Sequence, residues 1–338
     1  MSSVVTLTPA PVLDRTYIID EMEAGKVNRA LEAYQYLSGK GLNVARTLHL
    51  AKTRVSGILP IGRDDEYLLF SMPQPHIIRF MPISGHIRVN TTVVERVSGR
   101  TTNFNQYAVP INSEDWYRVC DLTGAEVEAL QADWLVVSGM QPINPDTGKY
   151  VDMEELFTLA RAQGTRIAID TSGPTLKTWA RNPLVNLIKP NCDELASLVG
   201  HSLHTIGDVV QAGKDLIAEG NLEIILASIG ADGALVISAD EAHWAHTAPQ
   251  QIVNTTGAGD ATLAGFIHSA GTSGSRSHGQ LQQLDLLAGL KRAVSWGSLA
   301  VTLPTTLIDD LTDAPEAIIA DHESQMDRPL IEPSQASA

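Results

Sequence analysis

Strand-like apolar runs alternate with helix-patterned segments through most of the second half of the chain. The runs are short, and most are separated by stretches in which apolar residues recur at helical spacing. They cover residues 134–137, 166–169, 185–188, 223–227 and 234–237. This alternation predicts a mainly parallel sheet with helices on both faces, in which ligands bind at the carboxyl ends of the strands.

The N-terminal part of the chain has a mixed pattern. Residues 4–7 and 54–60 have the composition of strands, and residues 64–70 are predicted to be helical. A further strand at 14–19 is expected to lead through a hairpin to residues 30–37. This region therefore combines pieces of an α/β layer with a separate β-hairpin.

Two other segments depart from the alternating pattern. Residues 76–107 are rich in Ile, Val and Thr, and they alternate clearly at 87–94 before a turn at 98–100, which predicts antiparallel strands. Residues 316–338 lose apolar periodicity, so we expect a C-terminal tail that is partly mobile at its end.

Two glycine-rich turns each precede a helix-patterned run, at residues 38–46 and 254–260. In the second turn, two glycines allow close backbone approach, and the following helix directs its free N–H groups and positive dipole end at an anion such as phosphate. Asp260 would repel that anion unless it has another task, such as accepting a proton from an attacking hydroxyl. The alternative is a carboxylate that only caps the helix.

Composition narrows the possible functions. The 338 residues are 43% hydrophobic, enough to fill a substantial core, and the formal net charge is -15. This charge argues against general binding of nucleic acid or anionic membranes, because both need an extended basic surface. Cys120 and Cys192 are too few for a disulfide framework. We see no secretion signal and no stretch of membrane-spanning length, and we expect a cytoplasmic protein.

Four ordered motifs together resemble the PfkB (ribokinase-like) family of carbohydrate kinases. They are GKGLNVAR at 39–46, KPNCDE at 189–194, SIGADG at 228–233 and NTTGAGD at 254–260. Neither the P-loop nor the dinucleotide fingerprint is present. The segments TLTPAPVLDR at 6–15 and GKVNR at 25–29 are most similar to the branch that contains the 1-phosphofructokinases and tagatose-6-phosphate kinases.

The resemblance implies a ribokinase-like α/β fold with a mainly parallel central sheet flanked by helices. It divides the chain into a kinase core (residues 1–11, 38–84 and 110–315) and a small β-sheet lid (residues 12–37 and 85–109). The lid would close over the sugar and exclude water from the reaction. Because the exposed lid also offers strand edges and an apolar face, a homodimer formed through the lid is expected.

The implied activity is transfer of the γ-phosphoryl group of ATP, with Mg²⁺, to a hydroxyl of a hexose phosphate. The acceptor would be of the fructose 1-phosphate, tagatose 6-phosphate or fructose 6-phosphate type. By this resemblance Asp260 is the catalytic base, and the N–H groups of Gly257, Ala258 and Gly259 form an anion hole. The alternatives are a kinase for an unphosphorylated sugar or nucleoside, and a non-catalytic sugar-phosphate sensor.

The nucleotide and metal sites are assigned from the same motifs. Positions that match the nucleotide site are Lys189, Asn191, Ser228, Gly230, Gly233 and Thr256. Asn191 and Glu194 match the motif that organises Mg²⁺ and its waters, which is chemically adequate because Mg²⁺ keeps several waters in proteins. Without the resemblance, Glu194 would be a favourable acid at a helix start, and the glycines would belong to a β-turn.

Acceptor-binding positions lie mainly in the first third of the chain. They are Asp14, Arg29, Gly39, Lys40, Asn43, Arg88 and Ser138. Arg88 is expected to bind the phosphate already on the sugar, since its guanidinium offers a fixed fork of donors; the alternative is an outward-facing charge on a lid strand. Ser38 and Met140 depart from the family pattern, and both departures fall on the acceptor side.

Overall fold

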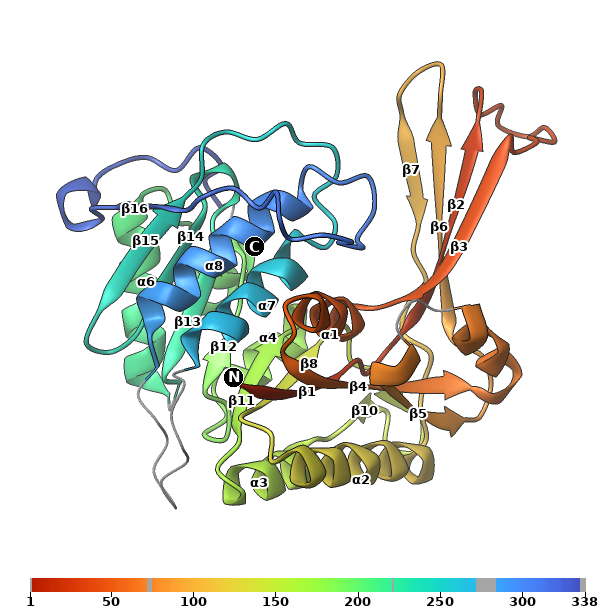
Figure 1. Ribbon diagram of the computed structural model, residues 1–338, viewed down its shortest axis with the longest axis horizontal. Coiled ribbons are helices and arrows are strands. Elements are labelled where there is room, and N and C mark those ends of the chain that lie inside the picture. The colour runs from red at the N-terminus through yellow and green to blue at the C-terminus, as the bar shows by residue number, and fades with distance from the viewer. Residues whose placement is uncertain (1, 72–74, 221, 272–283, 335–338) are drawn as a thin grey trace.

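A large mixed sheet forms the centre of the computed structural model, which describes residues 2–71, 75–220, 222–271 and 284–334 (Figure 1). Its ten strands lie in the order β16-β15-β14-β13-β12-β11-β8-β1-β4-β5. Pairing is parallel from β5 to β13 and antiparallel from β13 through β16. The predicted mainly parallel α/β sheet is therefore confirmed.

The strands are short and mostly buried, as expected for a sheet covered on both faces. The strands of the large sheet are β1 (Ser3–Leu7), β4 (Arg54–Gly62), β5 (Ile78–Ile83), β8 (Trp134–Ser138), β11 (Arg166–Asp170), β12 (Leu187–Ile188), β13 (Ile224–Ser228), β14 (Ala234–Ile237), β15 (Ala242–His246) and β16 (Ile318–Ala320). A separate two-stranded ribbon consists of β9 (Ile143–Asn144) and β10 (Lys149–Tyr150).

Helices cover both faces of the large sheet. One face packs against α2 (Ser113–Leu130), α3 (Glu154–Ala162), α4 (Gly173–Trp179), α5 (Cys192–Val199) and α6 (Ile206–Glu219). The other face packs against α1 (Lys40–Leu50), α7 (Ala258–Ala270) and α8 (Leu286–Ala300). Four short 3₁₀ helices, η1 (Arg63–Ser71), η2 (Pro75–Ile77), η3 (Gly230–Asp232) and η4 (Glu323–Gln325), complete the described elements.

Side chains of single strands divide between the two helical layers. Val5 and Leu7 contribute to the core under α2 to α6, whereas Val4 contributes to the core under α1, α7 and α8. This division follows from the alternation of side chains along a strand. None of the helices in the described part of the chain combines the length and apolar character that a bilayer crossing requires.

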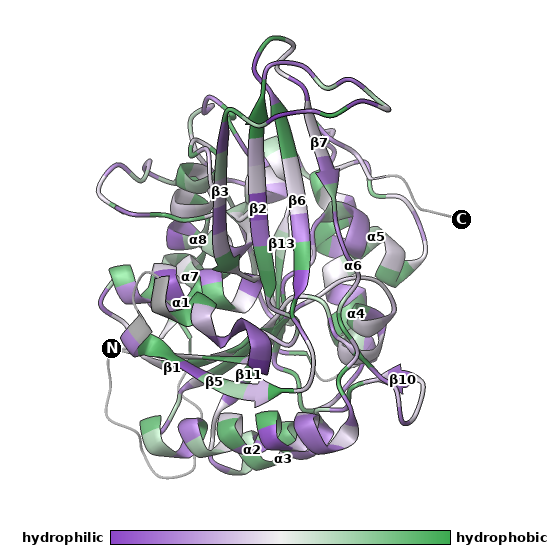
Figure 2. Ribbon diagram, turned by 90° about the vertical axis from the view of Figure 1, so that its right-hand side faces the viewer, coloured by the Kyte–Doolittle hydropathy of each residue, from purple (hydrophilic) through white to green (hydrophobic). Residues whose placement is uncertain are grey.

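A second sheet of four strands stands apart from the large one (Figures 1 and 2). Its order is β3 (Glu32–Ser38), β2 (Val12–Ile19), β6 (Arg88–Glu95) and β7 (Thr101–Phe104). We call it the lid sheet. On the central strands β2, from Asp14 onward, and β6, up to Val94, almost every residue is only partly buried. Neither face of the lid sheet is therefore fully covered by the rest of the described chain.

The structure corrects two expectations for the segment at residues 76–107. Instead of joining an antiparallel arrangement, Ile78–Ile83 extends the edge of the large sheet parallel to β4. Arg88–Glu95 then pairs in parallel with β2, and only its pairing with β7 is antiparallel. Alternation of apolar residues shows which face of a strand is buried, but it carries no information on the direction of the neighbouring strand.

The C-terminal segment also differs from the expected tail. Its strand β16 pairs with β15, and Leu330 is buried in the core under α5 and α6. The periodicity that would signal a helix is absent because this segment binds through backbone hydrogen bonds and scattered side chains. The expectation of mobility at the very end falls on residues 335–338, which lie outside the described residues.

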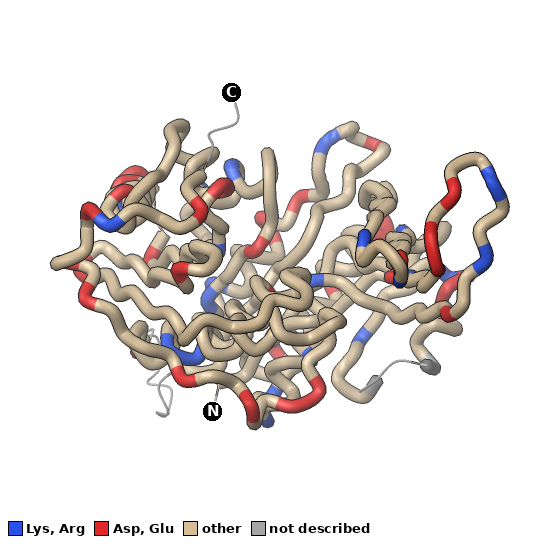
Figure 3. The backbone as a smooth tube through the Cα atoms, turned by 90° about the horizontal axis from the view of Figure 1, so that it is seen from above, with Lys and Arg blue, Asp and Glu red and all other residues tan. Residues whose placement is uncertain are grey.

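Charged residues are mixed over the molecule. Seen from above, Lys and Arg positions are interspersed with the more numerous Asp and Glu positions (Figure 3). An anionic ligand must therefore be held by particular cations and backbone N–H groups, and not by a general positive field.

Candidate active site

Polar and charged residues gather where the parallel strands end. Ser138 ends β8, Asp170 ends β11, Lys189 follows β12 and Ser228 ends β13. Because parallel strands present their carboxyl ends at one edge, these side chains face the region where such sheets bind ligands. The N-termini of α1 and α7 supply the glycine turns at the same edge.

Asp260 lies in the first turn of α7, and only 4% of its surface is exposed. Gly257 caps this helix at φ 89°, a left-handed conformation that favours glycine. The amide Nδ2 of Asn43, on α1, donates to Asp260 Oδ2 at 2.8 Å. The other polar atom of this amide, Asn43 Oδ1, is buried without a hydrogen-bond partner among the described atoms, so it is available to a ligand hydroxyl.

Asp170 is a second buried carboxylate at this edge, and it was not among the site residues predicted from the sequence. Lys40 Nζ lies 3.3 Å from Asp170 Oδ1, and Lys189 Nζ lies 3.6 Å from the same oxygen. Ser138 Oγ donates to Asp170 Oδ2 at 3.1 Å. Asp170 thus holds two ammonium groups that the sequence had assigned separately to the acceptor and the nucleotide.

Lys189 is a buried lysine whose ammonium group lies at the second glycine turn. A lone lysine is usually a solvated charge, but Lys189 is only 4% exposed. A Cβ added to Gly259 would lie 2.9 Å from its ammonium nitrogen, so the ammonium packs directly against the glycine turn. A side chain at position 259 would displace the Lys189 ammonium from this position, so glycine suits the close approach.

The electrostatics of the cluster set opposite protonation preferences for its members. Burial raises the pKa of Asp260 to about 7, and the charge of Asp170 adds to this rise, while Lys40, Lys189 and the Asn43 amide act in the other direction. Burial also acts to raise the pKa of Asp170, but Lys189 and Lys40 hold it below the usual value. Asp170 raises the pKa of Lys40, with smaller contributions from Asp260 and Glu194.

The acceptor positions lie at the base of the lid sheet. Asp14 and Asn90 are register partners on β2 and β6, and Arg88 is two residues away on the same strand as Asn90. Burial raises the pKa of Asp14, although Ser38, Arg88 and Asn90 act to lower it. Arg88 Nε is buried without a hydrogen-bond partner among the described atoms, while its Nη1 donates to the Gln106 carbonyl at 3.3 Å.

Gly39 and Met140 adjoin the acceptor positions. Gly39 adopts φ 147°, and a Cβ there would lie 2.5 Å from Thr8 Cγ2, so this turn requires glycine. Met140 is 40% exposed, and its sulfur accepts a bond from the Ala108 N–H at 3.3 Å. Met140 therefore lies beside the irregular segment that follows β7.

Arg29 is not brought to this cluster. It lies in the connection between β2 and β3, at the end of the lid sheet remote from Ser38. The register runs from Val12 opposite Ser38 to Ile18 opposite Glu32, so the lid sheet separates the two ends by roughly 20 Å.

The nucleotide positions are held by two joined turns. Asn191 and Ser228 form an isolated parallel β-bridge, which places the start of α5 beside the end of β13. Gly230 and Gly233 belong to the η3 turn and both have positive φ. Thr256 is exposed in the other loop, where its N–H donates to Asn254 Oδ1 at 3.0 Å.

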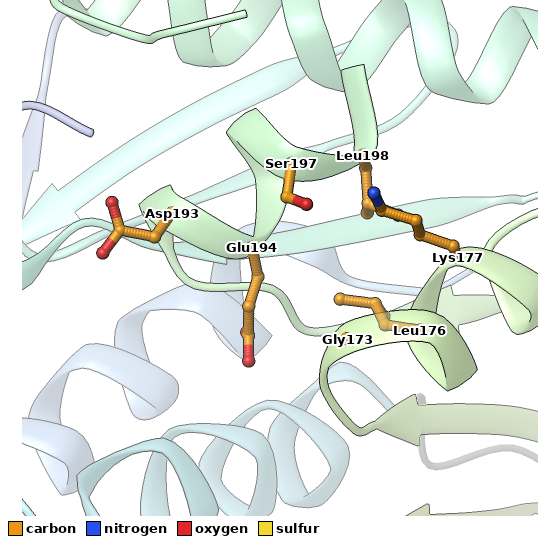
Figure 4. A pocket seen from close by; sticks show the side chains of 7 residues that line it. All are labelled: Gly173, Leu176, Lys177, Asp193, Glu194, Ser197 and Leu198. Atoms are coloured by element: carbon orange, nitrogen blue, oxygen red, sulfur yellow. The ribbon is translucent and has the colours of Figure 1, made fainter. Parts of the chain in front are cut away.

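Asn191 and Glu194 form a reciprocal cap at the start of α5. Glu194 N donates to Asn191 Oδ1 at 2.7 Å, and Asn191 N donates to Glu194 Oε2 at 2.9 Å. The first-turn carboxylates of Asp193 and Glu194 diverge, and Glu194 borders a cavity of about 180 Å³ between α4 and α5 (Figure 4). The capping interpretation is thus true of this structure, and Glu194 remains partly exposed to solvent.

These residues suit a hydrated Mg²⁺ and not a closed protein cage. The described ranges contain no group of three or more His, Cys, Asp or Glu side chains that could hold a metal ion. One partly exposed carboxylate and one exposed amide match an ion that keeps most of its waters and takes further oxygens from nucleotide phosphates.

The sequence pattern of the pfkB family carbohydrate kinases matches residues 8–311. This chain belongs to the pfkB family. It is 32% identical over 314 residues to 1-phosphofructokinase from Haloferax volcanii, a match that covers 92% of this chain and 94% of that protein. The 1-phosphofructokinase of Escherichia coli K12 is 29% identical over 301 residues, covering 88% of this chain and 93% of that protein.

Solved structures of pfkB family proteins share the fold. Phosphofructokinase-2 from Escherichia coli in complex with fructose-6-phosphate superposes with a TM-score of 0.75 at 24% identity, covering 93% of this chain and 98% of that one. The ribokinase-like architecture expected from the motifs is confirmed by this likeness.

The charge cluster makes a prediction for the pKa of Asp260. Replacing Lys40 with Met removes a positive charge that lowers this pKa, so the pKa should rise above about 7. Asp170→Asn removes a negative charge that raises it, so the pKa should fall. Titration of the Asp260 carboxyl by ¹³C NMR in the two variants measures both shifts. Shifts of the same sign would contradict the arrangement, and exposed Glu128→Gln serves as the control without a shift.

Proposed function

We propose that this chain is an ATP- and Mg²⁺-dependent kinase that phosphorylates a hydroxyl of a hexose phosphate, with fructose 1-phosphate as the preferred acceptor. The observation that carries the proposal is the position of Asp260: a buried carboxylate in the first turn of α7, beside two ammonium groups and a glycine turn. The names of the curated relatives support the acceptor class.

Asp260 is the proposed base. Its pKa of about 7 is suited to accepting a proton at neutral pH, because a base works best when its pKa lies near the operating pH. The Asn43 amide fixes the orientation of the carboxylate through its bond to Oδ2. In the proposed reaction the acceptor hydroxyl donates its proton to Asp260 while its oxygen attacks the γ-phosphorus and ADP departs with the bridging oxygen.

The developing negative charge is met by backbone and side-chain donors. The first N–H groups of α7, from Gly257 to Gly259, have no carbonyl partner earlier in that helix. In this structure Ala258 N forms a long bond of 3.3 Å to the Thr255 carbonyl, which a phosphoryl oxygen would replace. Lys189 and Lys40 add positive charge at the same place, and Asp170 keeps both ammonium groups there in the free protein.

The remaining residues are assigned to the metal ion on the nucleotide side of the site and to the sugar phosphate on the acceptor side. Asn191 and Glu194 would hold Mg²⁺ through its waters, and the ion would supply charge neutralisation between the nucleotide phosphates. Asp14 and Asn43 would bind sugar hydroxyls, and Arg88 would bind the phosphate already on the sugar. The half-buried Arg88 guanidinium suits that task, because burial disfavours its charged form until an anion arrives.

A panel of acceptors tests the proposed function. ADP formation from Mg-ATP is measured with fructose 1-phosphate, fructose 6-phosphate, tagatose 6-phosphate, free fructose and adenosine. Fructose 1-phosphate should give the largest kcat/KM, and Arg88→Ala should raise the KM for phosphorylated acceptors by about tenfold or more while exposed Arg96→Ala leaves it unchanged. Phosphorylation of free fructose or adenosine alone would favour the alternative kinases, and no reaction with any acceptor would favour a sensor.

We also propose that the lid sheet pairs with that of a second copy. Tyr17, Ala33, Val93 and Thr102 form one row across the four strands. This row lies on the face opposite Asp14, because side chains alternate along β2. Packing two such partly apolar faces together would bury the lid-sheet surface that the rest of the chain leaves partly exposed. It would also restrict the motion of each lid sheet.

The lid pairing predicts a mass that depends on the lid face. The wild-type chain should sediment as a dimer in analytical ultracentrifugation, and Val93→Glu should shift it toward the monomer by placing a charge in the apolar row. Thr92→Glu, one residue away on the opposite face, is the matched control and should remain dimeric. A wild-type chain that is monomeric at high concentration with ATP and sugar phosphate would contradict this proposal.

A further inference from the structure

The C-terminal segment crosses the turn that carries two of the proposed nucleotide-binding glycines. The pfkB match ends at residue 311, so residues 326–334, which we call the C-terminal strap, lie beyond the sequence that defines the family. The strap nevertheless contacts the 228–233 turn through several side chains. A segment outside the family match therefore packs against the proposed nucleotide side of the site.

Backbone hydrogen bonds fix the path of the strap. Gly207 N donates to the Met326 carbonyl at 2.8 Å, and Leu330 N donates to the His204 carbonyl at 2.8 Å. At its end, Ser334 N donates to the Leu203 carbonyl at 3.0 Å. These bonds, together with the buried Leu330 side chain, hold the strap along the start of α6.

Asp232 ties the strap to the turn itself. Its side chain is fully buried, and its Oδ1 lies 2.8 Å from Arg328 Nη2. Its Oδ2 accepts a bond from Ile331 N at 2.6 Å. The Arg328 guanidinium also lies over the Trp244 ring, 4.7 Å from the centroid, and the Trp244 Nε1 donates to the Asp232 carbonyl at 2.8 Å. The turn and the strap therefore form one unit.

This unit places an exposed carboxylate beside Gly230. A Cβ on Gly230 would lie 2.6 Å from Glu332 Oε2, so the carboxylate occupies the space in which any larger residue would project its side chain. Gly230 has φ 59°, which favours glycine independently. Asp232 of the turn anchors the strap through Arg328, and Leu330 anchors it in the core; neither contact requires an acid at position 332.

The chemistry of a nucleotide limits what this carboxylate can bind. Its phosphates would be repelled, and its hydrogen-bond donors are the ribose hydroxyls and, in adenine, the amino group. The proposed phosphate positions are at Gly257–Gly259 and Asn191, and the bridge from Asn191 to Ser228 leaves Gly230 only two residues further along. Two residues span at most about 7 Å, which is the reach from the phosphates to the adjoining sugar.

We propose that Glu332 is a nucleotide-binding residue that accepts a hydrogen bond from the ribose hydroxyls, positioned by the C-terminal strap. This inference rests on the proposed function, because it takes the 228–233 turn to be part of the nucleotide site. It adds a specificity-determining residue from outside the family match and makes the C-terminal segment a part of the site.

The test compares binding of ADP and 2′,3′-dideoxy-ADP by isothermal titration calorimetry, without any acceptor. Wild-type protein should bind ADP about tenfold more tightly than the dideoxy analogue, which is the range expected for a hydrogen bond to a charged group. Glu332→Ala should lose this preference by weakening ADP binding alone, and Glu332→Gln should lose part of it. Glu323→Ala, another exposed acid of the C-terminal segment, is the matched control.

Other outcomes would overturn the inference. Unchanged ADP affinity in Glu332→Ala would remove Glu332 from the site, and an equal loss for both nucleotides would exclude the ribose as its partner. Tighter ADP binding would show that the carboxylate faces the phosphates. A chain that binds ADP with the predicted ribose dependence but phosphorylates no acceptor would contradict the proposed function and retain this inference.

Discussion

Burial of two carboxylates beside two ammonium groups is the constraint on which the rest of the site depends. Asp260 and Asp170 are both almost fully removed from solvent, and their mutual repulsion is offset by Lys40 and Lys189. Such a cluster is costly to assemble, since charges lose hydration on burial. The fold imposes this cluster, because it brings several elements to one edge of the sheet. They are the ends of the parallel strands, the lysine that follows β12 and the N-termini of α1 and α7.

This arrangement joins stability to the proposed chemistry. The pKa of Asp260 in the folded chain, about 7, lies above its ordinary value of 3.8. A group with a raised pKa favours folding below its unfolded pKa, and this contribution is lost as the pH rises through the folded value. Burial of Asp260 therefore lowers stability at neutral pH, and its proposed role as a base gives a reason for that cost. A carboxylate that only favoured the start of α7 would not need to be buried in this way.

Much of the fold followed from local patterns, whereas the site needed tertiary information. The alternation after residue 134 predicted the parallel sheet, and the two glycine turns identified the loops that surround Asp260. Asp170 was not predicted as a site residue because an acid at the end of a short strand forms no recognisable local motif. Its position at the carboxyl end of a parallel strand could still have marked it as a candidate, since ligands bind at that edge of the sheet. Lys189 was assigned to the nucleotide site from its motif alone, and its burial could not be predicted because residues far away in sequence create it. The C-terminal strap was missed because its contacts are single side chains and backbone bonds, which leave no periodicity.

Asp260 is proposed as the base of a phosphoryl transfer, and not merely as an acid in the first turn of α7, where Gly257 is the N-cap and no side chain caps the helix. The most direct measurement is single-turnover phosphoryl transfer by Asp260→Asn, with ADP affinity and thermal unfolding measured on the same sample. If Asp260 is the base, this variant should lose at least a hundredfold in the rate of transfer and keep its ADP affinity. Its melting temperature, measured in buffers above pH 7, should be equal to or higher than that of the wild type. A transfer rate near that of the wild type would contradict this role of Asp260.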